Sequence, residues 1–87
     1  MTQDIDEVLK ERGKRYGEFK EHAFIVQAIK FTMHKSPNWD ELSPDKQEAL
    51  EMIAHKVARI LNGDPEYIDS WMDIAGYSKL VADTLEG

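Results

Sequence analysis

The fold of this chain depends most on residues 43–65, which read SPDKQEALEMIAHKVARILNGDP. Ser43 followed by Pro44 predicts a helix start, because Ser is a favoured N-cap residue and Pro is favoured at the first helical position. The apolar residues that follow recur at helical spacing: Leu50, Ile53, Ala54, Val57, Ile60 and Leu61. Gly63 stands where a left-handed C-cap is expected. We therefore expect a helix that ends at Gly63 and packs this stripe into the core.

The next segment repeats the same start pattern. Asp64 and Pro65 again place an N-cap candidate before a proline, so another helix is expected to begin there and to run to about Leu85. Its predicted inward stripe consists of Tyr67, Trp71, Ile74, Ser78, Val81 and Leu85. Since the link between the two helices is very short, they are expected to form an antiparallel hairpin.

Two more helices are predicted before residue 43. Asp4, with Glu7 three positions later, resembles a capping box, and the helix that it begins is expected to end at Gly13. Residues 18–35 are expected to form a helix with two apolar stripes, one of Phe19, Ala23, Val26, Ile29 and Met33, the other of Phe24, Ala28 and Phe31. Residues 39–42 are expected to form a single turn.

No stretch alternates long enough to predict a strand. The fold class expected is therefore all-α: one compact helical domain over residues 1–87, with one short helix and three longer ones. The 87 residues are 41% hydrophobic and 32% charged, which is too short for two cores and too apolar for a disordered chain. Because so small a domain buries little surface alone, a homo-oligomer, a dimer or larger, is expected.

The composition also excludes several classes of protein. The absence of Cys excludes a disulfide scaffold, a thiolate zinc site and a cysteine nucleophile. The acidic N-terminus and the lack of a long apolar run predict a protein of the (host cell) cytoplasm with no membrane partner. The net charge of −6 argues against general DNA binding, although residues 10–35 carry +4 and residues 36–87 carry −7. That asymmetry fits self-association, a phosphate ligand or two solvated faces.

The segment before Gly63 carries a polar row of Glu48, Glu51, His55 and Arg59, expected on the side away from the core stripe. This row is either an exposed ion-pair ladder or a functional site. In the second interpretation Glu51 and His55 handle a metal or a proton, and Lys56 or Arg59 holds a phosphate.

The last helix carries a second polar row, formed by Asp69, Asp73, Gly76 and Leu80. Two aspartates four residues apart could coordinate a hard cation such as Mg²⁺ or Mn²⁺. A glycine in mid-helix costs about 1 kcal/mol relative to alanine, so Gly76 suggests close approach of another backbone or a ligand. The competing interpretation is that the aspartates pair with basic residues of a neighbouring helix, or that the row is an oligomer seam.

Two smaller signals complete the set of candidates. Residues 11–17, ERGKRYG, place Arg15 and Tyr16 between two glycines, where they could hold an anion or form a helix–helix corner. Trp39 is expected to plug the loop that contains it, with base stacking as the alternative.

Four motifs together resemble a small all-helical domain of unknown function from bacteriophages and prophages. They are ERGxxYGxF at 11–19, SPNW at 36–39, ALEMIAHKxxRILNGDP at 49–65 and DxWxDIAGY at 69–77. The resemblance covers nearly the whole chain. More distantly the chain is similar to MazG-like nucleotide pyrophosphohydrolases, whose paired acidic motifs would correspond to Glu48-x-x-Glu51 and Glu66-x-x-Asp69. The residues themselves favour Asp69 and Asp73 as the second pair, and His55, Lys56 and Arg59 depart from the acidic pattern of those enzymes.

These observations predict a protein that binds a nucleotide or a related phosphate, with metal-assisted phosphoanhydride hydrolysis as a further expectation. The expected catalytic residues are Glu51, His55, Asp69 and Asp73, with Glu51, Asp69 and Asp73 as metal ligands. The expected ligand-binding residues are Lys56, Arg59, Tyr77, Arg15 and Tyr16. The alternative is a non-catalytic phage protein that binds or inhibits a host protein through an acidic face at Glu41, Asp45 and Glu48. A virion component is a weaker third option.

Overall fold

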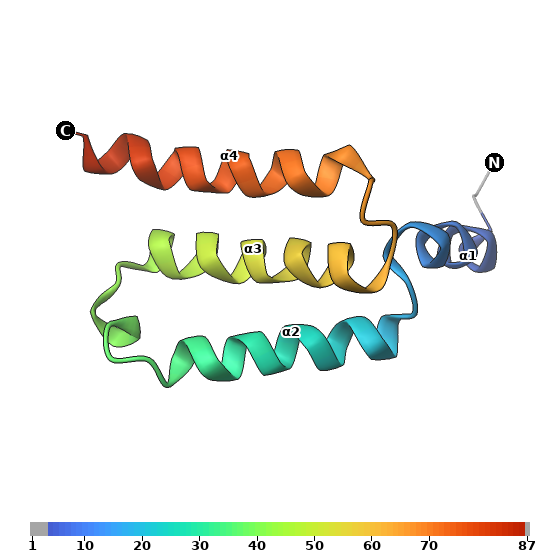
Figure 1. The fold of residues 1–87 in the computed structure, drawn as a ribbon, viewed down its shortest axis with the longest axis horizontal. Helices are drawn as coiled ribbons and strands as arrows, with labels where there is room; N and C mark the ends of the chain where they lie inside the picture. Colours follow the sequence, from blue (N-terminus) through green and yellow to red (C-terminus); the bar gives the residue numbers. More distant parts are fainter. Residues whose placement is uncertain (1–3, 87) are drawn as a thin grey trace.

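The computed structural model describes residues 4–86 and contains helices but no strand in that range. In chain order the elements are α1 (Ile5–Tyr16), α2 (Phe19–His34), the 3₁₀ turn η1 (Trp39–Glu41), α3 (Pro44–Asn62) and α4 (Ile68–Leu85). The all-α prediction is confirmed, including the short first helix and the antiparallel α3–α4 hairpin (Figure 1). None of the helices within residues 4–86 is long and apolar enough to cross a membrane.

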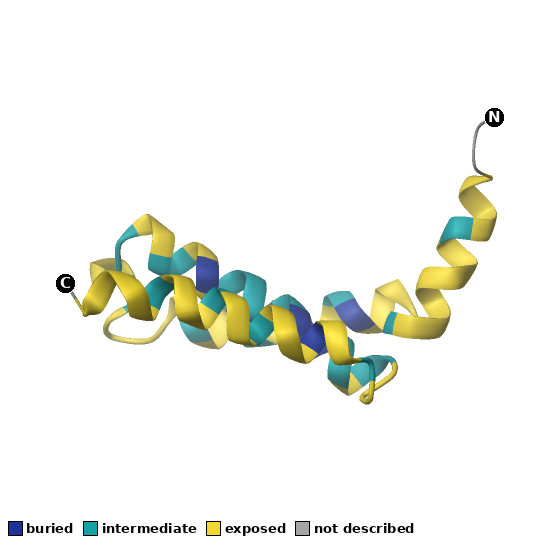
Figure 2. Cartoon of the chain, turned by 90° about the horizontal axis from the view of Figure 1, so that it is seen from above, coloured by how far each residue is buried: buried dark blue, intermediate teal, exposed yellow. Residues whose placement is uncertain are grey.

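Three of the helices lie side by side in one layer. Figure 1 shows α3 in the middle, with α2 along one edge and α4 along the other. Figure 2 shows that α1 leaves the plane of this layer at one end. We call the side of the layer that faces the viewer in Figure 1 the front face, and the opposite side, toward which α1 projects, the back face.

The buried apolar core is small, and α3 supplies most of it. The buried hydrophobic side chains in the described part are Val26, Ala49, Ala54 and Ala58, with Val26 only 2% exposed. The alanines let α2 and α4 approach α3 closely from its two sides, because short side chains keep the helix axes near each other. The central helix is therefore α3.

The first helix begins as predicted but ends later. Asp4 is its N-cap, and the Asp4 carboxylate accepts a hydrogen bond of 3.0 Å from the backbone N–H of Asp6. The predicted end at Gly13 is wrong, because α1 continues to Tyr16 and ends at Gly17. A lone glycine weakens a helix without stopping it. Gly17, with φ +80°, adopts the left-handed conformation that breaks the helix.

The link between α3 and α4 also differs from the prediction. Gly63 ends α3, but its φ of −112° is not left-handed. Glycine is needed there because a Cβ would collide with the backbone of Arg15 and Tyr16. Asp64 accepts a hydrogen bond of 2.9 Å from the N–H of Glu66, which caps a turn, and α4 begins later, at Ile68.

The predicted inward faces are only partly correct. On α4 the indole of Trp71 is 54% exposed and Leu85 is also exposed, whereas Ser70 is buried against α3 together with half-buried Ile74, Tyr77 and Val81. The small Ser70 allows close helix contact, and the Trp71 N–H donates instead to the Pro65 carbonyl at 2.8 Å. On α2 the second predicted stripe, formed by Phe24, Ala28 and Phe31, is exposed. Phe19 of the first predicted stripe is exposed as well.

Candidate functional site

The end of the layer where α1 meets α3 and α4 gathers five polar and aromatic side chains, which we call the corner: Arg15, Tyr16, Arg59, Tyr67 and Asp69. Arg15 Nη1 donates a hydrogen bond of 3.0 Å to Tyr67 Oη, and that hydroxyl donates one of 3.0 Å to Asp69 Oδ2. The accepting Asp69 carboxylate raises the pKa of the Tyr67 phenol above its ordinary value of 10.0. The phenol therefore stays a donor toward Asp69 at neutral pH.

Each arginine of the corner also lies over a tyrosine ring. Arg59 Cζ is 4.2 Å from the centre of the Tyr16 ring, and Arg15 Cζ is 5.0 Å from that of Tyr67. The two rings meet edge to face with centroids 6.2 Å apart. A guanidinium that uses its flat face on a ring keeps its N–H groups for oxygen atoms. In Arg15 these groups already have partners, because Nη1 donates to Tyr67 Oη and Nη2 lies 3.2 Å from Glu11 Oε1, so a ligand oxygen would replace Glu11 there. The guanidinium groups of Arg15 and Arg59 come from helices that are distant in sequence.

Backbone contacts hold α1 in this position. The Asn62 side-chain amide donates to the carbonyl oxygens of Tyr16 and Glu18, at 3.1 and 3.0 Å. The N–H of Asp64 donates to the Arg15 carbonyl at 2.7 Å. Gly17 fits beneath Asn62, because a Cβ at position 17 would collide with the Asn62 carbonyl and side chain. We call these contacts the clasp, and they fix where Arg15 and Tyr16 lie.

Two stacked histidines lie next to the corner, between α2 and α3. The rings of His22 and His55 are 5.7 Å apart at 28°. Burial lowers the pKa of His55 below its ordinary value of 6.5, and the cations Lys30, Arg59 and Lys56 lower it further, against a smaller opposing effect of Glu51. Three cations therefore lie near this imidazole, although the chain as a whole carries −6.

His22 is the more buried of the two rings. Burial lowers its pKa below 6.5, and the neighbouring His55 and Arg59 lower it further. Its Nδ1 atom is buried without a hydrogen-bond partner. Both imidazoles are therefore neutral at neutral pH, which suits their stacked arrangement.

The structure pairs two residues that the sequence analysis assigned to different roles. Lys56 Nζ lies 3.0 Å from Asp73 Oδ2, and the lysine is only 8% exposed. This contact matches the competing interpretation of the Asp69–Asp73 row, in which an aspartate pairs with a basic residue of the next helix. Asp69 is engaged by Tyr67 instead, so the two aspartates have separate partners.

Glu51 is also engaged elsewhere. Its Oε2 lies 2.7 Å from His34 Nε2, and the His34 ring packs on Trp39 with centroids 4.7 Å apart. Trp39 thus lies half-buried against α2, as its predicted role of loop plug implies. Within residues 4–86 no group of three or more His, Asp or Glu side chains is arranged to hold a metal ion.

Tyr77 and Gly76 lie away from the corner. Tyr77 lines a shallow groove of about 230 Å³ between α3 and α4, together with Leu42, Lys46, Ala49, Leu50, Ile53, Ser78 and Val81. A Cβ built at Gly76 would meet no other atom within 4 Å, so no backbone of this chain approaches it. The predicted close approach is not made within the chain.

Of the nine predicted site residues, the structure brings Arg15, Tyr16, Arg59 and Asp69 together and places His55 beside them. His55 and Arg59 do not form part of an exposed ion-pair ladder, because they lie half-buried beside His22 and Tyr16. Tyr67, which links Arg15 to Asp69, was not among the predicted site residues, and neither were His22 and Lys30. Only the spacing of Tyr67, two residues before Asp69, could have indicated the first.

The fold and corner define an all-α domain with one polar, tyrosine-braced end. Residues 2–85 match the family described as a domain of unknown function (DUF6378), and the chain belongs to that family. No curated protein and no solved structure matches the chain. The expected resemblance to a domain of unknown function is thereby confirmed, whereas the phage origin and the MazG likeness stay predictions.

Proposed function

We propose that the corner binds a small phosphorylated ligand, with a nucleotide as the expected class. The observation that carries this proposal is the convergence of Arg15 and Arg59, each braced by a tyrosine ring. A guanidinium fork matches the oxygens of a phosphate, and bracing reduces the entropy lost on binding.

The surroundings of the corner support an anionic ligand. Beside the larger effect of burial, Lys30, Arg59 and Lys56 lie close enough to His55 to lower its pKa, so cations are gathered next to the corner. A neutral His55 could donate or accept a hydrogen bond without adding a charge. Asp69 would orient the Tyr67 hydroxyl, and the two half-buried tyrosine rings would offer apolar surface to a base.

The proposal is for binding, and it includes no metal-dependent step. The carboxylates predicted to hold Mg²⁺ do not fit a shared site in this arrangement, because Glu51 contacts His34, Asp73 contacts Lys56 and Asp69 contacts Tyr67. Hydrolysis of a phosphoanhydride therefore stays a prediction, which an assay for released pyrophosphate or phosphate with and without Mg²⁺ or Mn²⁺ would test.

The first experiment is thermal unfolding of the full chain with nucleoside mono-, di- and triphosphates and inorganic pyrophosphate. A ligand at 100 times its dissociation constant adds about 2.7 kcal/mol, which raises the midpoint of a small domain by roughly 10 °C or more. Arg59→Gln and Arg15→Gln should remove the shift. Lys79→Gln, a charge removal on the far part of α4 where Lys79 pairs only with nearby Asp83, should keep it.

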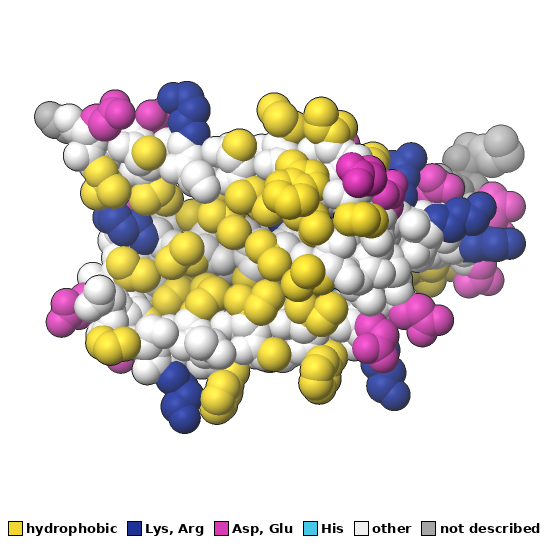
Figure 3. All heavy atoms as spheres, viewed as in Figure 1, with side chains coloured by type: hydrophobic (Ala, Val, Ile, Leu, Met, Phe, Trp, Pro, Cys, Tyr) yellow, Lys and Arg dark blue, Asp and Glu magenta, His cyan; other side chains and the backbone are white. Residues whose placement is uncertain are grey.

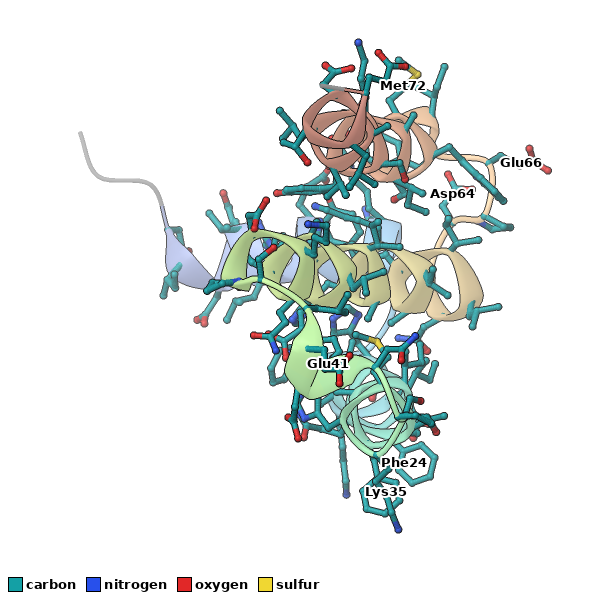
Figure 4. All side chains as sticks on the ribbon, turned by 90° about the vertical axis from the view of Figure 1, so that its left-hand side faces the viewer. Phe24, Lys35, Glu41, Asp64, Glu66 and Met72 are labelled. Carbon is teal, nitrogen blue, oxygen red and sulfur yellow. The ribbon has the colours of Figure 1, made fainter. Side chains whose placement is uncertain are left out.

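An unchanged midpoint for every ligand would overturn the proposal for the isolated protein. A shift that Arg59→Gln and Lys79→Gln diminish equally would overturn the assignment to the corner. An unchanged midpoint would favour the alternative of a host-protein inhibitor. That alternative uses the exposed carboxylates Glu41, Asp45 and Glu48 at the opposite end of α3, where Figure 4 shows Glu41. Charge reversal at these three positions should leave nucleotide binding intact.

A further inference from the structure

The front face of the layer is broad, apolar and open to solvent. Figure 3 shows hydrophobic side chains over α2, α3 and α4, with charged side chains mostly around the perimeter. Leu50 and Leu61 of α3 and Trp71 and Leu85 of α4 are large apolar residues that are all at least 40% exposed. Four exposed side chains of this size on two adjacent helices form a patch, not scattered single residues.

Helix periodicity shows that this face has the pattern of a packed seam. Leu50, Ala54, Val57 and Leu61 are spaced four, three and four residues apart along α3. On α4 the exposed positions 71, 75, 78, 82 and 85 repeat the same spacing, with small Ala and Ser residues between Trp71 and Leu85. This is the spacing with which one helix buries side chains against another. On α3 the ends of the stripe, Leu50 and Leu61, are exposed, whereas Ala54 is buried and Val57 is half-buried. The α4 positions are all exposed.

The accessible surface of the chain is too large for a closed domain. It measures 6691 Å², roughly 1,500 Å² more than the about 5,200 Å² expected for a compact monomer of 10.0 kDa. The radius of gyration is 15.1 Å, against about 12 Å for a compact chain of this length. The projecting α1 and the open layer both contribute to the excess. A standard interface removes about 800 Å² from each partner, which is less than the excess surface of this chain.

We infer that a second copy of this chain covers the front face, so that two three-helix layers pack face to face. A two-fold axis lets one self-complementary patch serve both copies. Although each chain carries −6, the charges lie mainly at the rim of this face, so the two copies would not oppose like charges at the centre. This inference goes beyond the proposed ligand site, which lies at the end of the layer and toward its back face.

The test is the mass of the full chain in solution, measured by sedimentation equilibrium from low to high micromolar concentration. We expect about 20 kDa, twice the 10.0 kDa of the chain. A mass that stays at that of the monomer at the highest concentration would overturn the inference, as would a dimer that forms through another surface.

A matched pair of variants locates the interface. Leu61→Glu places a carboxylate on the front face, and Leu80→Glu places one on the polar row of α4; the two leucines are 67% and 66% exposed. Leu61→Glu should raise the dimer dissociation constant by roughly 100-fold or more, because a buried carboxylate would lack a partner. Leu80→Glu should leave the dissociation constant unchanged.

Equal effects of Leu61→Glu and Leu80→Glu on the dissociation constant would contradict the inference. Phe24→Glu, at the outer edge of α2 in Figure 4, is a second control.

A spectroscopic readout covers the case in which Leu61→Glu fails to fold. In a Trp39→Phe background Trp71 is the single indole, and it is 54% exposed in one copy. Its emission should shift to longer wavelength on dilution, in parallel with the loss of mass. A dimer whose Trp71 emission does not change on dissociation would place the interface elsewhere. Both readouts are independent of nucleotide binding. A negative result for the dimer therefore does not bear on the proposed ligand site, and a negative result for the ligand does not bear on the dimer.

Discussion

Lys56 of α3 and Asp73 of α4 form an ion pair whose two members are unequally buried. The distance from Lys56 Nζ to Asp73 Oδ2 is 3.0 Å, and 10% of the lysine side chain but 48% of the aspartate side chain is exposed. Solvent can reach the carboxylate but hardly the ammonium group. The free energy of unfolding should therefore respond differently to the loss of each partner.

Asp73→Asn is expected to destabilise the protein more than Lys56→Met. Removing the carboxylate leaves a buried ammonium group without a counter-charge, which costs about 1–3 kcal/mol, whereas removing the lysine leaves a carboxylate that water can solvate. Urea unfolding of both single variants and of the double variant measures the difference. Equal losses, or a larger loss for Lys56→Met, would contradict this reading of the pair.

The stability of the protein is expected to decrease as the pH falls below about 6.5. Burial and neighbouring cations lower the pKa of His22 and of His55 in the folded state. The unfolded chain, with ordinary pKa values near 6.5, then binds more protons than the folded one, so stability is full above that pH and is lost between it and the lower folded pKa values. Thermal unfolding between about pH 8 and pH 5 should show the decrease.

Variants of the two histidines test the origin of that decrease. His55→Gln and His22→Gln should each flatten the dependence of the unfolding midpoint on pH, and the double variant should flatten it most. Removing His55 should also weaken the dependence due to His22, because burial and then His55 lower the pKa of His22. Unaltered pH profiles would assign the acid sensitivity to other groups.

Gly17 and Gly13 provide a matched test of the clasp. Gly17 has φ +80°, and a Cβ there would strike Asn62, so Gly17→Ala should destabilise the protein by about 1 kcal/mol or more. Gly13 lies inside α1 with nothing near its Cβ position, so Gly13→Ala should stabilise it by up to about 1 kcal/mol. Chemical unfolding of the two variants checks the opposite signs. The same sign in both would contradict the described geometry.

Gly76→Ala distinguishes a packing role from a ligand role for the mid-helix glycine of α4. Since its Cβ position is open, the substitution should raise the free energy of unfolding by about 0.5–1 kcal/mol. The midpoint without ligand measures that effect, and the nucleotide panel measures binding in the same samples. A loss of stability would mean that another copy approaches Gly76, and a loss of binding alone would extend the ligand site to α4.

The sequence predicts where the helices begin better than it predicts which side of each helix packs against another helix. Caps such as Asp4 and the Ser43–Pro44 pair are local signals, and they predict where α1 and α3 begin. The faces are harder to predict, because a helix in the middle of a layer buries polar and apolar sides alike. Periodicity alone therefore allows an exposed ladder for Arg59 and His55 and predicts a core position for Trp71, whereas the structure half-buries the first two and exposes Trp71.

The sequence indicates which residue types could form the corner, but not that these residues lie together in space. The chemistry of Arg15, Tyr16 and Arg59 makes them candidates for anion binding, yet whether they meet depends on the direction in which α1 leaves α2. That direction is fixed by Asn62, which is 46 residues from Tyr16 in the chain. No periodicity or cap carries information over such a separation.

The clasp has a consequence for the order in which the molecule folds. Its bonds close loops of more than forty residues, whereas the α3–α4 hairpin needs only a short connection. Closing a loop of that length costs more chain entropy than pairing two helices joined by a short link. The hairpin is therefore expected to form early and α1 to dock late. Docking of α1 can then reverse while the layer stays folded. The corner would thus be assembled in the last step of folding, and hydrogen exchange at its amides would be faster than at those of α3.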